Sequence, residues 1–390
     1  MSSTSVPLPA IQKRLLAAAL AVAAGLVFSL PGGGMRPALL FLVGLGIGVS
    51  LYHASFGFTS AYRRAYLEKD LSGVSAQMVM LVLAMGLFAP VLANGQIFGQ
   101  GVVGAIAPVS VSMAFGAFIF GIGMQIGGGC ASGTLYTAGG GNRKMILVLI
   151  FFSLGTFWGS LDLPWWSSLP GIGAVSLSRQ FGWPGAIALQ LGLLAAIYAV
   201  LRRLGGRNKR PLWPEAGFHP RNLLRGPWPL LPAAILLALF NLATLLLAGH
   251  PWTITWGFSL WTAKAAAILG WDPSTSLFWS GGFQQAALAQ PILADTTAMM
   301  DIAIILGATI AAALAGKAGP KSPLPPRTLA AVAIGGLAMG YGARLAYGCN
   351  IGAFFSGVAS TSLHGWVWIF MAVPGNIIGI RLRPLFHFDR

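Results

Sequence analysis

Hydrophobic residues run along this chain in long blocks, and polar residues gather in the stretches between them. A helix that crosses a bilayer needs roughly 17 to 25 mostly apolar residues. Counting interrupted ones, ten stretches reach this length: 12–31, 37–57, 73–93, 108–127, 145–163, 184–202, 229–249, 296–316, 328–347 and 365–382. The first resembles a signal peptide, but no small-x-small cleavage site follows it, so we expect a retained helix. The pattern predicts an all-α polytopic membrane protein.

The composition agrees with this prediction and excludes a soluble domain and a disulfide scaffold. Hydrophobic residues make up 56% of the chain and charged residues 8%, whereas a soluble domain carries about 25% charged residues. Two cysteines cannot form a disulfide scaffold, and the chain has no Cys-x-x-Cys or His-x-x-x-His spacing. We therefore expect no metal site and no cofactor.

The net charge of +16 indicates an orientation rather than a nucleic-acid partner. Cytoplasmic loops of membrane proteins carry an excess of Lys and Arg. If both termini are cytoplasmic, 20 of the 24 basic residues lie inside, and the exceptions are Arg36, Arg179, Lys264 and Arg344. The polar stretch 202–228 holds seven basic residues and is predicted to be a cytoplasmic loop between two halves, 1–183 and 184–390.

The two halves share a sequence repeat. The pattern Gly-x-Gly-x5-Gly-Cys-x2-Gly occurs at 121–133 and again at 340–352, at a constant offset of 219. A weaker match pairs 56–59 with 256–259, around Gly57 and Gly257, and a base follows each copy. Because each half has five predicted spans, an odd number, the second copy should enter the membrane in the opposite orientation. We expect two inverted repeats, as in many transporters.

Glycine-rich interruptions follow the same positions in both halves. The segment 127–141 holds seven glycines, and its counterpart is 348–362. Backbone that is not helical at membrane depth must line a watered cavity or pack inside protein. The sequence therefore predicts broken or re-entrant helices beside a conduit.

The only two cysteines, Cys130 and Cys349, occupy equivalent positions at these breaks. A buried cysteine is often an inert small hydrophobe, but the duplication favours a role for both. A helix that starts after each cysteine would direct N–H groups at an anion. The candidate path residues are thus Cys130, Cys349, Gly129, Gly348, Ser132, Thr134, Asn350, Gly57 and Gly257.

Four charged residues lie near or within predicted spans. Lys264 and Arg344 either line a substrate path or extend to the outer interface, and the sequence leaves both readings open. Asp295 and Asp301 lie near the start of a span, where we expect them to be interfacial.

Three motifs carry a resemblance to a known family. Gly-Gly-Cys-Ala-Ser-Gly at 128–133, Gly-Cys-Asn-Ile-Gly at 348–352 and Phe-Thr-Ser-Ala-Tyr-Arg at 58–63 resemble those of the YeeE/YedE family of sulfur-compound transporters, which includes bacterial thiosulfate permeases. The resemblance implies a bacterial inner-membrane protein whose inverted repeats form an hourglass and whose pore cysteines pass thiosulfate by hydrogen bonding. It also suggests a cytoplasmic sulfur-carrier protein as a partner. The thiosulfate permeases carry a further cysteine where this chain has Gly57.

Three functions remain open at this point. The first is uptake of a small sulfur-containing anion, with thiosulfate as the main expectation. Neutral thiols would meet its soft sulfur, while loop N–H groups and Ser132, Thr134 or Asn350 would meet its oxygens. The second is a membrane-embedded, sulfurtransferase-like enzyme that uses a cysteine persulfide, although no general base adjoins either cysteine in sequence. The third is a passive anion channel.

Overall fold

The computed structural model describes residues 9–214, 219–319 and 324–386. Two of the basic residues predicted to be cytoplasmic, Lys321 and Arg390, lie outside these ranges. Within them, nine helical stretches are long and apolar enough to cross a membrane, which confirms an all-α polytopic membrane protein. The stretches are α2 with α3 (Met35–Ala54, Phe58–Leu67), α4 (Ser72–Asn94), α5 with α6 (Val111–Gly127, Ala131–Gly139), α7 (Arg143–Ser167), α8 (Leu177–Arg203), α10 (Leu230–Ala248), α13 (Thr296–Ala315), α14 with η3 and α15 (Pro326–Leu345, Asn350–Phe355, Ser356–Ala359), and α16 with η4 (Leu363–Leu382, Arg383–Phe386).

Shorter elements complete the described chain. They are α1 (Lys13–Phe28), α9 (Arg221–Arg225), α11 (Thr255–Ile268), η1 (Pro273–Thr275), α12 (Gly282–Ala289), η2 (Ile292–Ala294), and two antiparallel ribbons made of β1 (Gln96–Ile97) with β2 (Gln100–Gly101) and of β3 (Pro108–Ser110) with β4 (Gly171–Ala174). The sequence predicted ten spans, and the difference is α1, which has only 16 residues. At 1.5 Å per residue it is about 24 Å long, just short of a typical span.

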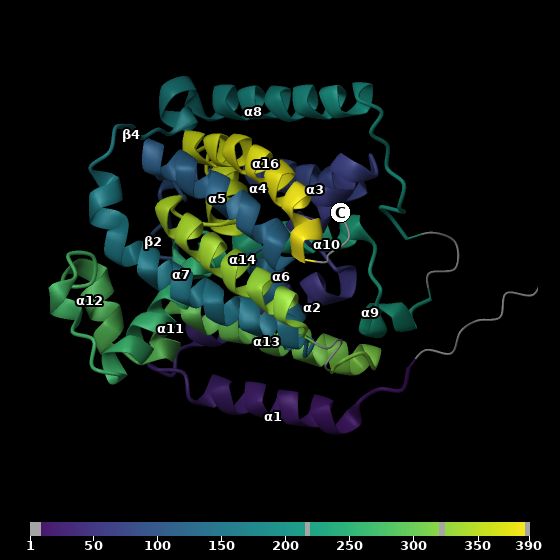
Figure 1. Cartoon of the computed structure of the whole chain (residues 1–390), viewed down its shortest axis with the longest axis vertical. Helices are drawn as coiled ribbons and strands as arrows, with labels where there is room; N and C mark the ends of the chain where they lie inside the picture. Colours follow the sequence, from purple (N-terminus) through teal and green to yellow (C-terminus); the bar gives the residue numbers. More distant parts are fainter. Residues whose placement is uncertain (1–8, 215–218, 320–323, 387–390) are drawn as a thin grey trace, which may run out of the picture.

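α1 nevertheless connects two opposite faces of the molecule. At its start, the backbone N–H of Gln12 donates to the carbonyl of Ala313 near the end of α13. Beyond its end, Arg36 donates to Gln100 in the β1–β2 ribbon. Figure 1 shows α1 along one edge, α8 along the opposite edge, and the other long helices between them. The first predicted segment is therefore a helix that extends from one face of the molecule to the other, as a membrane span would.

One of these faces carries most of the Lys and Arg residues, and we call it the basic face. Arg225 hydrogen-bonds to the Pro9 carbonyl, and Arg381 to the Tyr66 hydroxyl, so each end of the described chain is attached to this face. The β-ribbons and α12 lie on the opposite face (Figure 1). The basic face is built from segments 9–14, 63–71, 140–144, 202–214, 219–228, 316–319 and 381–386.

An ion pair fastens the long polar loop to the basic face. Arg210 Nε lies 2.8 Å from Asp70 Oδ2. Burial alone would raise the pKa of Asp70, but hydrogen bonds from Ser72, from the Lys209 backbone N–H and from Arg210 lower this pKa to about 2. Asp70 therefore stays ionised at neutral pH, and the loop stays attached to the turn between α3 and α4.

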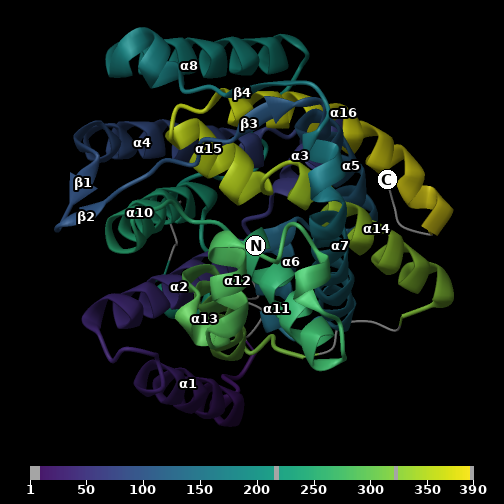
Figure 2. The same cartoon turned by 90° about the vertical axis from the view of Figure 1, so that its left-hand side faces the viewer.

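The helices pack in matching pairs. α2 packs against α13 as α10 packs against α4, and α7 packs against α14 as α16 packs against α5. α5 and α14 contact each other between these pairs. Figure 2 shows α8 and α1 again on opposite edges. This pairing is what a duplication would produce and supports it, while the opposite orientation of the two halves in a bilayer stays a prediction.

The repeated glycines allow this packing. A Cβ atom at Gly121 would lie 2.3 Å from the Ala372 carbonyl oxygen, and one at Gly340 would lie 2.2 Å from the Phe152 carbonyl oxygen. Real Cβ atoms do not approach this closely, so the helix backbones touch only because these positions lack side chains. Small residues serve the same purpose at many helix contacts in membranes. The Gly-x-Gly part of the repeat is thus explained by packing.

We expect Gly340→Ala to lower the stability of the protein by about 1–3 kcal/mol, because an inserted methyl group must push α14 away from α7. The matched control is Gly192→Ala in α8, where no atom lies within 4 Å of an added Cβ. Melting temperatures in detergent, measured as soluble monodisperse protein after heating, should fall for the first variant only. Equal melting temperatures would contradict the packing explanation.

Candidate functional site

The two cysteines lie together at the centre of the structure. Cys130 sits between α5 and α6, and Cys349 sits between α14 and η3. α5 packs on α14, and α6 contacts η3, so the two breaks come together. Both thiols are free, each residue is only 1% exposed, and the two lie within electrostatic range of each other.

Each break depends on a glycine in a left-handed backbone conformation. Gly128 has a φ of 88° and Gly348 a φ of 148°. A residue with a Cβ atom rarely adopts such angles, whereas glycine does so readily. α5 ends directly before Gly128, whereas α14 ends at Leu345, three residues before Gly348, and a new helical segment begins directly after each cysteine. After Cys349 this segment is η3, a stretch of π-helix, a form that often occurs at functional sites.

The thiols themselves make weak local contacts. The Cys130 sulfur lies 3.5 Å from Ser132 Oγ, and the Cys349 sulfur accepts a hydrogen bond from the Ile351 N–H at 3.4 Å. Over the described ranges, no carboxylate, imidazole or amine hydrogen-bonds to either sulfur. The structure thus provides no hydrogen-bonded general base for the persulfide alternative.

Buried polar atoms without partners surround the two thiols. They are the hydroxyl of Thr134, four residues after Cys130, together with the hydroxyl of Tyr62 and the amide of Asn350, which lie near each other without a hydrogen bond of full geometry. Tyr62 is also within electrostatic range of Cys130, and Asn350 directly follows Cys349. Buried polar groups are nearly always hydrogen-bonded in native proteins. A small polar ligand or water at the thiols would supply the missing partners, which suits a site for a small anion.

The paired glycines of the weaker repeat have different surroundings. A Cβ atom at Gly57 would lie 3.2 Å from Ser60 Oγ and 3.5 Å from the Tyr136 hydroxyl. Tyr136 is within electrostatic range of Cys130, so position 57 faces the Cys130 side of the site. At Gly257, the Cβ would lie 2.5 Å from Asp301 Oδ2. Both positions therefore border the site, but only the second faces a carboxyl group.

The structure distinguishes the roles of Lys264 and Arg344, for which the sequence left the same two readings open. Lys264 donates to the carbonyls of Leu288 and Gln290, both at 2.6 Å, and so holds the end of α12. Arg344 donates to Ser259 Oγ at 2.6 Å, while its Nε has no partner. Its guanidinium carbon lies 5.7 Å from the ring of Trp256 and 5.2 Å from that of Phe278. Arg344, five residues before Cys349, thus keeps a buried donor without a partner, whereas the Lys264 ammonium is held by two backbone carbonyls.

Sequence reasoning placed one residue wrongly and missed two others. Asp301, expected at the interface, is fully buried and its carboxyl group has no hydrogen-bond partner. Its position inside a block of apolar residues was the available signal. Tyr62 lies within the motif 58–63 and could have been found there, whereas nothing in the sequence distinguished Tyr136.

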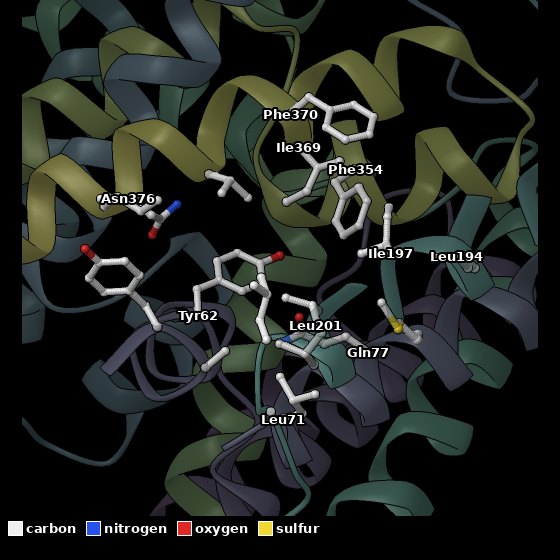
Figure 3. Close-up of a pocket in the computed structure, with 18 of the residues that line it drawn as sticks. Tyr62, Leu71, Gln77, Leu194, Ile197, Leu201, Phe354, Ile369, Phe370 and Asn376 are labelled. Carbon is white, nitrogen blue, oxygen red and sulfur yellow. The ribbon is translucent and has the colours of Figure 1, made fainter. Parts of the chain in front are cut away.

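A cavity of about 550 Å³ lies beside the site, between α8 and the helices α3, α4 and α16. Its lining is mostly apolar and includes Leu201, Phe354 and Ile369 together with Tyr62 (Figure 3). Neither cysteine lines it. Lipid chains suit such a lining better than an anion does, so we do not assign this cavity to the path.

Comparison with known proteins covers most of the chain. The family model for sulphur transport matches residues 53–378, which include all the candidate path residues. The thiosulfate transporter TsuA of Spirochaeta thermophila is 30% identical over 351 residues, covering 86% of this chain and 95% of that protein. TsuA of Escherichia coli is 23% identical over 353 residues, covering 86% and 91%. The probable transporter YedE of Escherichia coli is 30% identical over 162 residues, covering 41% and 39%.

Proposed function

Because the chain belongs to the sulphur transport family, we propose that it carries thiosulfate, or a closely related sulfur-containing anion, across the membrane between Cys130 and Cys349. The observation that supports this most is the pair of buried free thiols beside the incompletely hydrogen-bonded side chains of Thr134, Tyr62 and Asn350. A cytoplasmic sulfur-carrier protein that receives the anion belongs to the proposal on the family resemblance alone.

The chemistry of the site suits an anion that must bind and then leave. A thiol S–H is a weak donor and can meet the terminal sulfur of thiosulfate. The amide of Asn350 and the hydroxyls of Thr134 and Tyr62 can donate to its oxygens. These donors are uncharged, so they replace water without holding the dianion as a buried cation would. A thiolate would repel the dianion, so the thiols act in the protonated form.

We also propose that the basic face is cytoplasmic and that the membrane is the bacterial inner membrane. This orientation follows the positive-inside rule. Reporter fusions at Gly206 and after Arg390 should both report a cytoplasmic location. A periplasmic signal at either position would contradict the orientation, and a fusion at Gln284 in α12 should give the periplasmic signal as a control.

In this orientation Arg344 lies on the outer side of the thiols and attracts the anion. We expect Arg344→Gln to raise the half-saturating thiosulfate concentration more at low salt than at high salt, because about 0.1 M salt screens exposed charges beyond about 10 Å. Lys264→Gln removes an equal charge from a residue that holds α12, and it is the matched control. Uptake measured at two ionic strengths distinguishes them. If both variants keep the salt dependence of the wild type, Arg344 has only a structural role.

The thiols provide the sharpest test. We expect Cys130→Ala or Cys349→Ala to reduce thiosulfate uptake into proteoliposomes by about tenfold or more, equivalent to about 1.4 kcal/mol or more. A methyl group cannot donate to the substrate, and Ser should rescue little, because its hard oxygen interacts less well with sulfur than a thiol does. Wild-type uptake should also be blocked by a thiol reagent, with protection by excess thiosulfate.

Two controls accompany the thiol variants. Each must elute as a monodisperse peak and melt near the wild-type temperature, so that loss of folding is excluded. A double variant with alanine at both positions should be insensitive to the reagent. Full uptake by this double variant would show that both cysteines only pack in the core and take no part in transport. Mass spectrometry of the wild type after thiosulfate exposure should show no added sulfur, and a persulfide mass would favour the enzyme alternative.

A further inference from the structure

Asp301 is a buried acid that the proposed path does not yet use. It lies six residues beyond Asp295, the residue that caps the start of α13, and so about 9 Å along the helix. Its exposed fraction is 0%, and both of its carboxyl oxygens are without a hydrogen-bond partner. The only ion pair recorded among the described residues is that of Asp70 with Arg210, so Asp301 has no paired cation.

The surroundings of Asp301 connect it with the thiols. Its carboxyl group occupies the space that a side chain at Gly257 of α11 would need. Cys349 and Asp295 are the titratable groups within electrostatic range of it. On the other sides of this part of α13, Gly44 of α2 packs against Met300, and Gly139 of α6 packs against Ile305, so neither contact brings a charged side chain.

Such a carboxyl group is most stable when it carries a proton. An ionised carboxylate without a paired cation or hydrogen-bond donors is strongly disfavoured in a low-dielectric interior. A dianion beside Cys349 would disfavour it further, because like charges repel strongly there. The proton on Asp301 and the anion at the thiols therefore favour each other.

We propose that Asp301 is the proton site that couples anion uptake to the inward movement of protons, an inference that rests on the proposed function. Its carboxylate takes up a proton from the outer side, which forms an O–H bond, and the neutral acid lets the dianion pass Cys349. After the anion has left, water that enters from the inner side solvates the carboxylate and accepts the proton, so that the O–H bond breaks and the proton is released to the inside. One proton carried with each dianion halves the charge that must enter against an inside-negative membrane potential.

The test measures proton and anion movement in the same vesicles. Wild-type protein in proteoliposomes that contain a pH-sensitive dye, with the membrane potential clamped by potassium and valinomycin, should acidify the interior as labelled thiosulfate enters. Asp301→Asn carries a permanently neutral side chain. It should still exchange labelled for unlabelled thiosulfate, but internal acidification and accumulation driven by an acid exterior should be lost. Asp272→Asn removes an exposed acid from the face opposite the basic face. This variant should retain exchange, internal acidification and accumulation.

Each outcome decides a separate point. Thiosulfate uptake by the wild type without acidification, or acidification that persists in Asp301→Asn, would overturn the inference and leave the proposed function intact. Loss of exchange in a folded Asp301→Asn protein would also overturn it. No thiosulfate uptake by the wild type would instead refute the proposed function. If Asp301→Asn does not fold, the wild type is compared with Asp301→Glu, which keeps a carboxyl group. Acidification that is retained in the wild type but altered in Asp301→Glu supports the inference, and equal acidification by both proteins overturns it.

Discussion

The direct contact of helix backbones at the centre of the molecule is the constraint on which the site depends. α5 and α14 approach each other closely enough that a Cβ atom at Gly342 would lie 2.5 Å from the carbonyl oxygen of Gly116. Only this approach brings the two breaks, and with them Cys130 and Cys349, into one place. A bulkier residue at these positions would separate the thiols even if both helices still formed. The glycines of the repeat therefore define the distance at which the chemistry takes place.

Much of the fold could be predicted from the sequence, because a bilayer requires long apolar segments. Nine of the ten predicted segments correspond to helical stretches of spanning length, and α1 falls about one turn short. The break after α5 was also predictable, because Gly128 ends that helix with a positive φ. α14 instead ends at Leu345 and is followed by Tyr347 with a φ of 55°, which the glycine pattern did not predict. The positions of Cys130 and Cys349 followed from the duplication, which preserves spacing.

The rest depended on contacts between segments that are distant in the chain. Asp301 looked interfacial because it lies near the end of an apolar block, and only the placement of α11 over it shows that it is buried. Lys264 and Arg344 were indistinguishable in sequence for the same reason. Lys264 differs from Arg344 because it donates to backbone carbonyls at the end of α12. Nothing in the sequence indicated that α12 would lie beside Lys264. Local patterns cannot predict such partners.

The cavity beneath α8 brings an apolar lining of the kind that suits lipid chains close to the site. α8 is the least buried of the nine stretches, with 17% of its most apolar window buried, and the cavity beside it reaches Tyr62 and Phe354. Tyr62 thus lies between this apolar cavity and the Cys130 side of the site. An acyl chain that filled the cavity would contact a ring beside the proposed anion path, so the position of that ring would respond to the length and fluidity of the lipid chains.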